Sequence, residues 1–413
     1  MKEQIQIDFN KTIETLNFSE NDVKLKKKCL NSFIEQGFPS KKLENWKFLD
    51  FNQIIKSNIG ELSFYNDYSL SNKVDTSVFI DGLEHNKITF INGRVEKIDF
   101  NYEDKNKIEI IENSVSDNKS SNNSLIDLNK AFINKSYKII VKKDYSPKKP
   151  LIVYHITNNK ISSRNVNLKL EFQLEQKSSL KIIDFFNDST EKNFINICYN
   201  FNLEKDAILK NYKIDKILNK NIKYFFNNIE QDENSISETF ILSSGSSFLK
   251  NEINCNLKGK YSSAFINGIF SLNTDKHHEI RTSVNHLVED TKSYQLIKSV
   301  LDDKSKSAYQ GKIYVNPEAQ KTDGYQLSKC ILLDKNTEFN AKPELEIYAD
   351  DVKCSHGSAS GSLSEDSIFY LRSRGLNYKQ AKKLLISGFF LDVIEKITDE
   401  EVKNYIKEIM EFN

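Results

Sequence analysis

Residues 166–174 read Val-Asn-Leu-Lys-Leu-Glu-Phe-Gln-Leu, and this stretch decides the type of fold. Every second residue is apolar, and the residues between them are polar or charged. Because successive side chains of a strand point to opposite faces of a sheet, this alternation predicts a strand with one buried face. Residues 195–203 and 264–272 have the same period. The surrounding segment, residues 131–360, is therefore predicted to consist of strands.

Short polar turns separate these predicted strands. They lie at residues 177–179, 205–206, 243–247 and 262–263 and are rich in serine and lysine. Their spacing is irregular, so the sequence contains no strict hexapeptide repeat. A long run of strand and turn favours a β-sandwich, a β-barrel or a β-solenoid. The period alone does not choose among the three.

Residues 1–60 have a helical pattern. Apolar side chains recur at helical intervals, as at Leu25, Cys29 and Phe33. The sequence Phe-Pro-Ser at residues 38–40 interrupts this pattern and begins a new segment.

Residues 61–130 mix short strands with polar turns. Residues 87–90 are one such predicted strand, and Asn-Gly at residues 92–93 is a strong turn signal. Residues 114–124 are rich in Ser, Asn and Asp and are predicted to form a loop.

The C-terminal region, residues 361–413, is predicted to be helical. Ser364 is a suitable N-cap for a first helix, Gly375 is a suitable stop, and Asn377 can cap a second helix. Thr398, with a glutamate three residues later, predicts a capping box for a third helix. These helices have apolar stripes, which must pack on the rest of the chain or on a partner subunit.

The composition excludes several classes of function. The 413-residue chain has a formal net charge of +1, so no net field favours nucleic acid or an anionic membrane. Its five cysteines form no C-x-x-C pair, which argues against a disulfide framework or a closed zinc site. Neither an N-terminal secretory signal nor a run of membrane-spanning length is present. These features indicate a protein of a reducing cytoplasm.

The densest chemical signal lies at residues 342–357, which read Lys-Pro-Glu-Leu-Glu-Ile-Tyr-Ala-Asp-Asp-Val-Lys-Cys-Ser-His-Gly. Leu345 and Ile347 alternate with charged residues, which predicts a strand. If that strand continues, Cys354 and His356 leave the same face of the sheet. Thiolate and imidazole suit iron, zinc or copper, but two ligands do not complete a site. The alternative for both residues is ordinary packing in a core.

Other candidate residues have weaker patterns. His277, His278 and His286 do not have the H-E-x-x-H spacing, so packing is favoured over a metal role. The acidic pairs 302–303 and 350–351 could suggest glycoside chemistry, but adjacent strand residues face opposite sides, which favours turn positions. The remaining cysteines lie among apolar neighbours and are predicted to be core residues: Cys29, Cys198, Cys255 and Cys330.

Several segments resemble the SufB/SufD family of iron–sulfur cluster assembly scaffolds. The similarity is greatest after residue 275. The segments that carry it are 44–48 (Glu-Asn-Trp-Lys-Phe), 90–93 (Phe-Ile-Asn-Gly), 310–315 (Gln-Gly-Lys-Ile-Tyr-Val), 319–326 (Ala-Gln-Lys-Thr-Asp-Gly-Tyr-Gln), 350–357 (Asp-Asp-Val-Lys-Cys-Ser-His-Gly) and 369–375 (Phe-Tyr-Leu-Arg-Ser-Arg-Gly).

The resemblance implies a mainly β fold with three parts. These are an N-terminal helical and mixed region (1–130), a right-handed parallel β-helix core (131–360) and a C-terminal helical domain (361–413). It also implies a non-catalytic scaffold that pairs with a SufB-like chain and binds a SufC-like ATPase. The absence of a G-x-x-x-x-G-K-[ST] motif agrees with ATP hydrolysis by the partner.

Within the family, the sequence is more similar to SufD than to SufB. SufB has a cysteine just before the strand that matches 345–348, whereas residues 334–339 have none here, and residues 291–293 lack the sulfur-accepting cysteine. His356 matches the SufD histidine at the shared interface. The resemblance therefore implies that His356 and Cys354 contribute to a transient cluster or iron site completed by the partner.

The resemblance also assigns Tyr370, Arg372 and Arg374 to the surface that docks the ATPase. Arginine can form bidentate contacts with carboxylates that lysine does not reproduce. Four alternatives stay open at this point: a SufB-like scaffold, a homodimer, a structural adaptor without a metal role, and a β-solenoid enzyme acting on polysaccharide.

Overall fold

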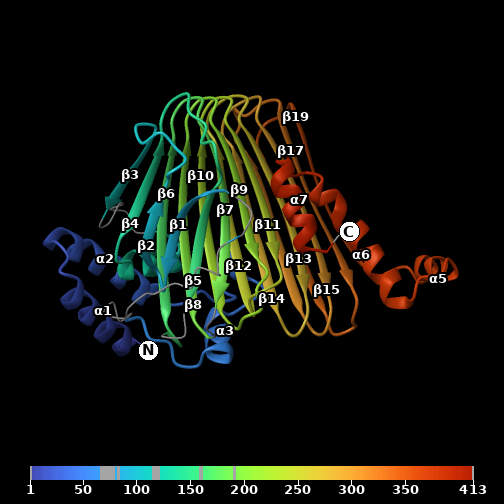
Figure 1. The fold of residues 1–413 in the computed structure, drawn as a ribbon, viewed down its shortest axis with the longest axis horizontal. Helices are drawn as coiled ribbons and strands as arrows, with labels where there is room; N and C mark the ends of the chain where they lie inside the picture. The colour runs from blue at the N-terminus through green and yellow to red at the C-terminus, as the bar shows by residue number, and fades with distance from the viewer. Residues whose placement is uncertain are drawn as a thin grey trace.

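The computed structural model describes residues 2–65, 80, 84–113, 121–157, 161–188 and 192–411. Its centre is a β-solenoid in which consecutive strands alternate between two sheets (Figure 1). The ten-stranded sheet has the spatial order β19 (Val352–Gly361), β17 (Thr322–Leu332), β15 (Lys292–Leu301), β13 (Ser263–Leu272), β11 (Ile236–Ser243), β9 (Ile208–Asp215), β7 (Ser179–Asp188), β5 (Leu151–Thr157), β1 (Asn86–Ile91) and β2 (Arg94–Asp99).

The nine-stranded sheet faces it. Its order is β18 (Glu338–Ile347), β16 (Lys306–Val315), β14 (His277–His286), β12 (Phe248–Leu257), β10 (Ile222–Gln231), β8 (Phe194–Leu203), β6 (Asn165–Leu174), β4 (Ser136–Val141) and β3 (Ile108–Asn113). Neighbouring strands are parallel except at β1–β2 and β3–β4, where antiparallel strands close the N-terminal end.

The coils stack in strict register, which confirms the parallel β-solenoid. Phe194, Ile222, Phe248, His277 and Lys306 are successive register partners along the nine-stranded sheet. The coils differ in length, which is why the sequence turns are unevenly spaced. Residues with a positive φ lie in two of the predicted turns, Lys177 and Asp206, and Tyr261 immediately precedes a third.

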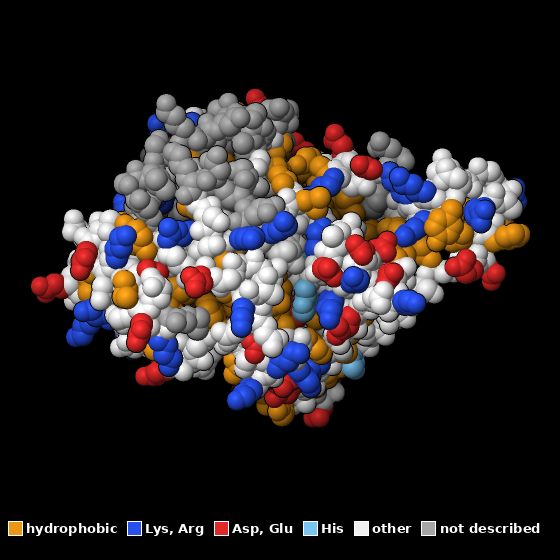
Figure 2. Space-filling model, turned by 90° about the horizontal axis from the view of Figure 1, so that it is seen from below, with side chains coloured by type: hydrophobic (Ala, Val, Ile, Leu, Met, Phe, Trp, Pro, Cys, Tyr) orange, Lys and Arg blue, Asp and Glu red, His pale blue; other side chains and the backbone are white. Residues whose placement is uncertain are grey.

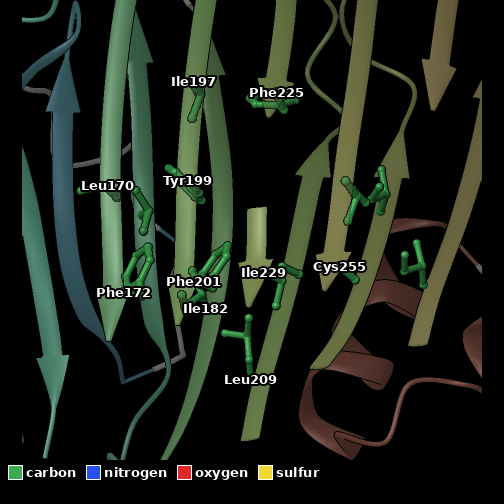
Figure 3. Packing of buried hydrophobic residues seen from close by; sticks show 14 of the residues in the cluster. Leu170, Phe172, Ile182, Ile197, Tyr199, Phe201, Leu209, Phe225, Ile229 and Cys255 are labelled. Carbon is green, nitrogen blue, oxygen red and sulfur yellow. The ribbon is translucent and has the colours of Figure 1, made fainter. Parts of the chain in front are cut away.

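The core lies in the lumen between the two sheets. The alternating residues of each strand point inward and stack on the same residues of the next coil, as Leu170, Tyr199, Phe172 and Phe201 do in Figure 3. Phe172 and Phe201 stack with a centroid distance of 5.0 Å. Each such buried side chain contributes roughly 1.5–3 kcal/mol relative to an exposed one, so the period of two supplies the main driving force.

The N-terminal helices cover the outer face of the nine-stranded sheet. They are α1 (Lys2–Leu16), α2 (Glu20–Gln36), η1 (Glu44–Trp46), α3 (Phe51–Asn58) and α4 (Ser124–Phe132). Their apolar residues pack with Phe194, Ile222 and Phe248 of the sheet. Helix α4 was not expected from the sequence. Most of the loop predicted at 114–124 lies outside the described residues, and Ser124 begins a helix because Asn123 caps it.

The C-terminal helices are α5 (Glu365–Ser373), α6 (Tyr378–Ile394) and α7 (Glu400–Ile409). Ser364 and Asn377 are N-caps, as predicted, and Gly375 has a positive φ of 96°. The predicted capping box at Thr398 is wrong. The N-cap of α7 is Asp399, which accepts from the Val402 amide, whereas the Thr398 hydroxyl donates to Glu238.

Helices α6 and α7 pack on the outer face of the ten-stranded sheet. Phe390, Val393 and Ile406 are buried there against Tyr212 and Leu242. Much of the C-terminal apolar stripe therefore packs on its own chain. Within the described residues, no helix combines the length and apolar character needed to span a membrane.

Candidate functional site

The C-terminal end of the solenoid has two free strand edges. Within the described residues, β18 pairs only with β16 and β19 only with β17. The backbone groups along the outer edges of β18 and β19 have no neighbouring strand in the sheet, and we call this surface the open end. An uncovered strand edge is a template for another chain to pair with.

Cys354 and His356 lie together on β19. The strand that contains Leu345 does not continue through Cys354, because β18 ends at Ile347 and β19 begins at Val352. The side chains of Cys354 and His356 still leave the same face of the sheet, as predicted, because the two residues are two positions apart on β19.

This shared face is the lumen face. Cys354 is the register partner of Gly324 and packs with Ile313 and Ala349 at the edge of the core. His356 is the register partner of Gln326, a buried residue that bonds to the Glu344 carbonyl across the lumen at 3.1 Å. Both side chains therefore point along the end of the core.

The two candidate ligands differ in exposure. The Cys354 thiol is half-buried, and burial raises its pKa, with the negative charge of Asp323 acting in the same direction. The Gly324 amide opposes this shift by favouring the thiolate. His356 is exposed. The isolated chain thus holds the cysteine mainly as a thiol, and a metal ion would have to displace its proton.

One chain does not supply a coordination sphere here. Among the described residues, no cluster of three or more His, Cys, Asp or Glu side chains is placed to hold a metal ion. Cys354 and His356 form a two-ligand fragment at the open end. Whatever completes the fragment has to approach over the edges of β18 and β19.

A second exposed surface lies on the first two C-terminal helices. We call α5 and the first two turns of α6 the α5–α6 arm (residues 365–384). It projects from the solenoid in Figure 1, and Figure 2 shows hydrophobic and basic side chains together on it. Its large apolar side chains are unusually exposed: Phe369 (73%), Tyr370 (57%), Tyr378 (54%) and Leu384 (51%).

The structure places the predicted docking residues on this arm. Tyr370, Arg372 and Arg374 are all exposed, and the Arg374 guanidinium lies 5.3 Å from the centroid of the Tyr370 ring. The buried side chain of α5 is Ile368. The sequence analysis did not assign Phe369 and Tyr378 to this surface. Phe369 lies next to Tyr370 in the middle of α5, and Tyr378 is the first residue of α6.

Comparison with known proteins decides the family. The sequence model described as "SUF system FeS cluster assembly, SufBD core domain" matches residues 155–389, more than half of the chain. The chain belongs to the SufBD family of iron–sulfur cluster assembly proteins. The match covers most of the solenoid and extends into the C-terminal helices.

Relatives within the SufBD family extend this result. The chain is 28% identical to the iron–sulfur cluster assembly protein SufD of Escherichia coli over 393 residues, which cover 91% of this chain and 89% of that protein. It is 37% identical over 103 residues to a SufBD family protein of Synechocystis, covering 25% and 23% of the two chains. It is 35% identical over 123 residues to the chloroplastic protein ABCI7 of Arabidopsis thaliana, covering 29% and 26%. The similarity along nearly the whole chain is to SufD.

Residues 44–48, which resemble a motif of the family, join the N-terminal region to the solenoid. Lys250 lies 4.2 Å from the Trp46 ring centroid, donates to the Asn45 carbonyl and pairs with Glu279 at 2.8 Å. Glu44 also forms an ion pair with Lys342 of β18. This segment therefore holds the N-terminal region against β12 and against β18, the last strand of the nine-stranded sheet.

Two further histidines of this SufBD chain, His278 and His286, are buried and hydrogen-bonded. The His278 ring donates to the Ser246 carbonyl at 2.7 Å and accepts from Ser243 at 2.9 Å, and burial lowers its pKa to about 4. His286 bonds to Thr291 and Ser293, and burial lowers its pKa to about 3. Both ring nitrogens of each residue are engaged in these bonds, which favours packing for His278 and His286.

The remaining sequence predictions also concern structure. The four cysteines predicted to be core residues are buried: Cys29, Cys198, Cys255 and Cys330. Asp302 and Asp303 lie in the turn after β15, and Asp350 and Asp351 lie between β18 and β19. The acidic pairs thus occupy turns and do not line a groove with their carboxylates.

Proposed function

We propose that this chain is the SufD-type scaffold subunit of an iron–sulfur cluster assembly complex and pairs with a SufB-like chain through the open end. Membership of the SufBD family supports the assembly function. The observation that carries the pairing is the pair of free edges on β18 and β19, one from each sheet. A partner strand added to either edge would satisfy backbone groups that are otherwise left to water.

We further propose that Cys354 and His356 contribute to a site for iron or a nascent cluster at this interface. They face the lumen side of the last coil, next to the edges where the partner would dock. The partner would supply the remaining ligands and accept sulfur. Because the ligands must be deprotonated, binding should strengthen as pH rises. Iron and sulfide are cargo in this scheme.

The α5–α6 arm is the proposed dock for a SufC-like ATPase. Interface hot spots are enriched in tyrosine and arginine, and the arm combines Tyr370, Arg372 and Arg374 with exposed Phe369. Helix α6 joins this arm directly to the face of the ten-stranded sheet. Movement of the docked ATPase would therefore be transmitted to the solenoid.

In this proposal the chain is non-catalytic and acts in the cytoplasm. Residues 1–130 anchor the solenoid and supply its strands β1, β2 and β3, residues 131–360 form the pairing core, and residues 361–413 dock the ATPase. A homodimer through the same edges is an alternative assembly in isolation.

The proposal is tested by co-expressing the chain with its genomic neighbours, followed by anaerobic reconstitution. We expect a SufB-like and a SufC-like chain to co-purify with it. In the His356→Ala variant, the complex and its ATPase activity should persist while iron per complex falls. Ser355→Ala is the matched control, because its side chain leaves the opposite face of the same strand. Unchanged iron in His356→Ala would refute the metal site, and failure of the wild-type chain to co-purify would refute the scaffold role.

A further inference from the structure

Three aromatic side chains stack on the outer face of the ten-stranded sheet, and we call them the aromatic ladder. Phe265 of β13, Tyr294 of β15 and Tyr325 of β17 are successive register partners. The ring centroids of Phe265 and Tyr294 are 5.9 Å apart, and those of Tyr294 and Tyr325 are 5.2 Å apart, with interplanar angles of 8° and 18°. The ladder lies on the outer face, because the residue after Tyr325 is Gln326, which points into the lumen.

The ladder stops one strand before the edge of the sheet. In β19 the register partner of Tyr325 is Ser355, which is exposed. The face of the Tyr325 ring that points toward β19 therefore has a small hydroxymethyl group beside it, where the earlier coils have another ring. The next position of the ladder is thus open at the edge where a partner strand would dock.

An apolar groove lies beside the ladder. Its volume is about 500 Å³, and its lining includes the three rings together with Leu296 and Leu327. On the β11 side, the Thr398 hydroxyl donates to Glu238 at 2.6 Å, and both residues line the groove. On the β19 side, the register partner of Leu327 is Gly357, so β19 places no large side chain across that end. The groove therefore opens toward the open end of the solenoid.

We propose that the partner chain paired with β19 places an aromatic side chain over Ser355, where it stacks on Tyr325 and extends the aromatic ladder beside the apolar groove. This inference rests on the proposed pairing at the open end. A strand added beside β19 lies two strand spacings, roughly 9–10 Å, from Tyr325. A tyrosine or tryptophan side chain that leans across the small Ser355 side chain spans this distance and brings its ring to the range of 4.5–7 Å that aromatic pairs prefer.

A second copy of this chain does not supply such a ring through β19. The side chains on the outer face of β19 belong to Lys353, Ser355, Gly357, Ala359 and Gly361, and none of them is aromatic. Pairing two copies edge to edge through β19 therefore brings only small or charged residues next to Tyr325. The ladder thus favours a different chain as the partner over a homodimer.

The stacking contact would give the pairing its selectivity. Backbone hydrogen bonds along β19 are available to any strand, so they supply affinity without choosing a sequence. A ring that packs against Tyr325 and Leu327 adds a buried aromatic anchor, which is the usual form of an interface hot spot. The position beside Ser355 therefore distinguishes a strand with an aromatic residue from one without it.

Titration of the purified SufB-like chain into variants of this chain tests the proposal. Tyr325→Ala removes the ring at the open end and should weaken binding about tenfold. Phe265→Ala is the matched control, because it removes the ring at the other end of the same ladder and also loses one stacking contact. We expect this control to bind the SufB-like chain as the wild type does.

A second pair of variants fills the open position from within the chain. Ser355→Phe places a ring beside Tyr325, and because Ser355 is exposed the variant should unfold in urea at or above the wild-type midpoint. The same ring excludes the partner's ring, so binding of the SufB-like chain should fall about tenfold. Ser355→Ala keeps the position open and should bind as the wild type does.

The outcomes separate the stacking contact from the pairing itself. Wild-type affinity in Tyr325→Ala or in Ser355→Phe would overturn the stacking contact and leave the pairing intact. An equal loss of affinity in Phe265→Ala and Tyr325→Ala would also overturn it, because the ladder would then act through the stability of the sheet. Failure of the wild-type chain to bind the SufB-like chain would instead refute the proposed function.

Discussion

The sulfur of Cys354 lies 3.4 Å from the position that a Cβ on Gly324 would occupy. The two residues are register partners on β19 and β17, and Ile313 Cγ2 lies at the same distance from that position. This spacing is an ordinary van der Waals contact for one methyl group. It leaves no room for a larger side chain, so the residue at position 324 controls where the thiol lies.

We predict that Gly324→Ala is tolerated and that Gly324→Leu is not. Alanine fits beside the thiol and removes the entropic cost of glycine in a strand, so the free energy of unfolding should rise by about 0.5 kcal/mol. Leucine should displace the Cys354 side chain and accelerate its reaction with a thiol reagent. Urea unfolding and thiol-labelling rates check both results.

Gly311→Ala is the contrasting variant on the same face. Its Cβ would collide with the Tyr309 ring, which cannot move without repacking, so a loss of about 1–3 kcal/mol is expected. Equal stability of the Gly311→Ala and Gly324→Ala variants would contradict this account of the lumen.

The N-cap of α7 gives a second prediction. Asp399 caps the helix and forms an ion pair with Lys181 at 2.5 Å, so Asp399→Ala should lower the free energy of unfolding by about 1–2 kcal/mol. Thr398→Ala loses one exposed hydrogen bond to Glu238 and should cost less than about 0.5 kcal/mol. Chemical denaturation of both variants tests the assignment, and a larger effect at Thr398 would restore the capping box read from the sequence.

The sequence predicted the strands well because their chemistry is local. The alternation at 166–174 requires only that one face be buried, and β6 spans that stretch. The solenoid could not be derived from the period, because it depends on register between strands in successive coils, as between Phe194 and Ile222. The resemblance to known scaffolds supplied that step.

The candidate site was predicted in part for the same reason. The spacing of Cys354 and His356 fixes their common face on any strand. The alternation at Leu345 and Ile347 does not show where that strand ends, so the break between Ile347 and Val352 could not be predicted. Contacts inside the lumen could not be predicted from the sequence. Asn211 and Gln295 are distant in the sequence, and only stacking of the coils brings them into one column.

Buried histidine gives a pH-dependent prediction. Burial lowers the pKa of His278 in the folded chain to about 4. Between pH 6.5 and pH 4, the unfolded chain therefore binds a proton at this residue and the folded chain does not. The contribution of this residue to the free energy of unfolding is complete above pH 6.5 and is lost as the pH falls toward 4. Nearby Asp215 opposes the shift, whereas Lys276 and His277 reinforce it.

The His278→Gln variant isolates this effect. Between pH 7 and pH 5, the free energy of unfolding should fall by about 2 kcal/mol more in the wild type than in the variant. Urea unfolding at the two pH values measures the difference. If the free energy of unfolding changed equally with pH in the wild type and the variant, His278 would bind its proton equally well in the folded and unfolded chains, and the prediction would be wrong.

The α5–α6 arm carries the last prediction. The double variant Phe369→Ala and Tyr370→Ala removes two exposed rings that contribute little to the fold of the isolated chain. We expect its thermal stability to stay within the range of ordinary surface changes, about 0.5 kcal/mol, while affinity for the SufC-like ATPase falls at least about tenfold. Calorimetric titration of the purified partner measures the affinity.

Two further variants separate the dock from general surface effects. Tyr348→Ala removes an equally exposed ring from the turn between β18 and β19, away from the arm, and should leave ATPase affinity unchanged. Arg372→Lys keeps the charge but loses the planar fork of donors, so a loss of affinity there would identify a bidentate contact. If the ATPase binds the double variant and the wild type equally well, the arm is not its dock, and the exposed rings require another partner.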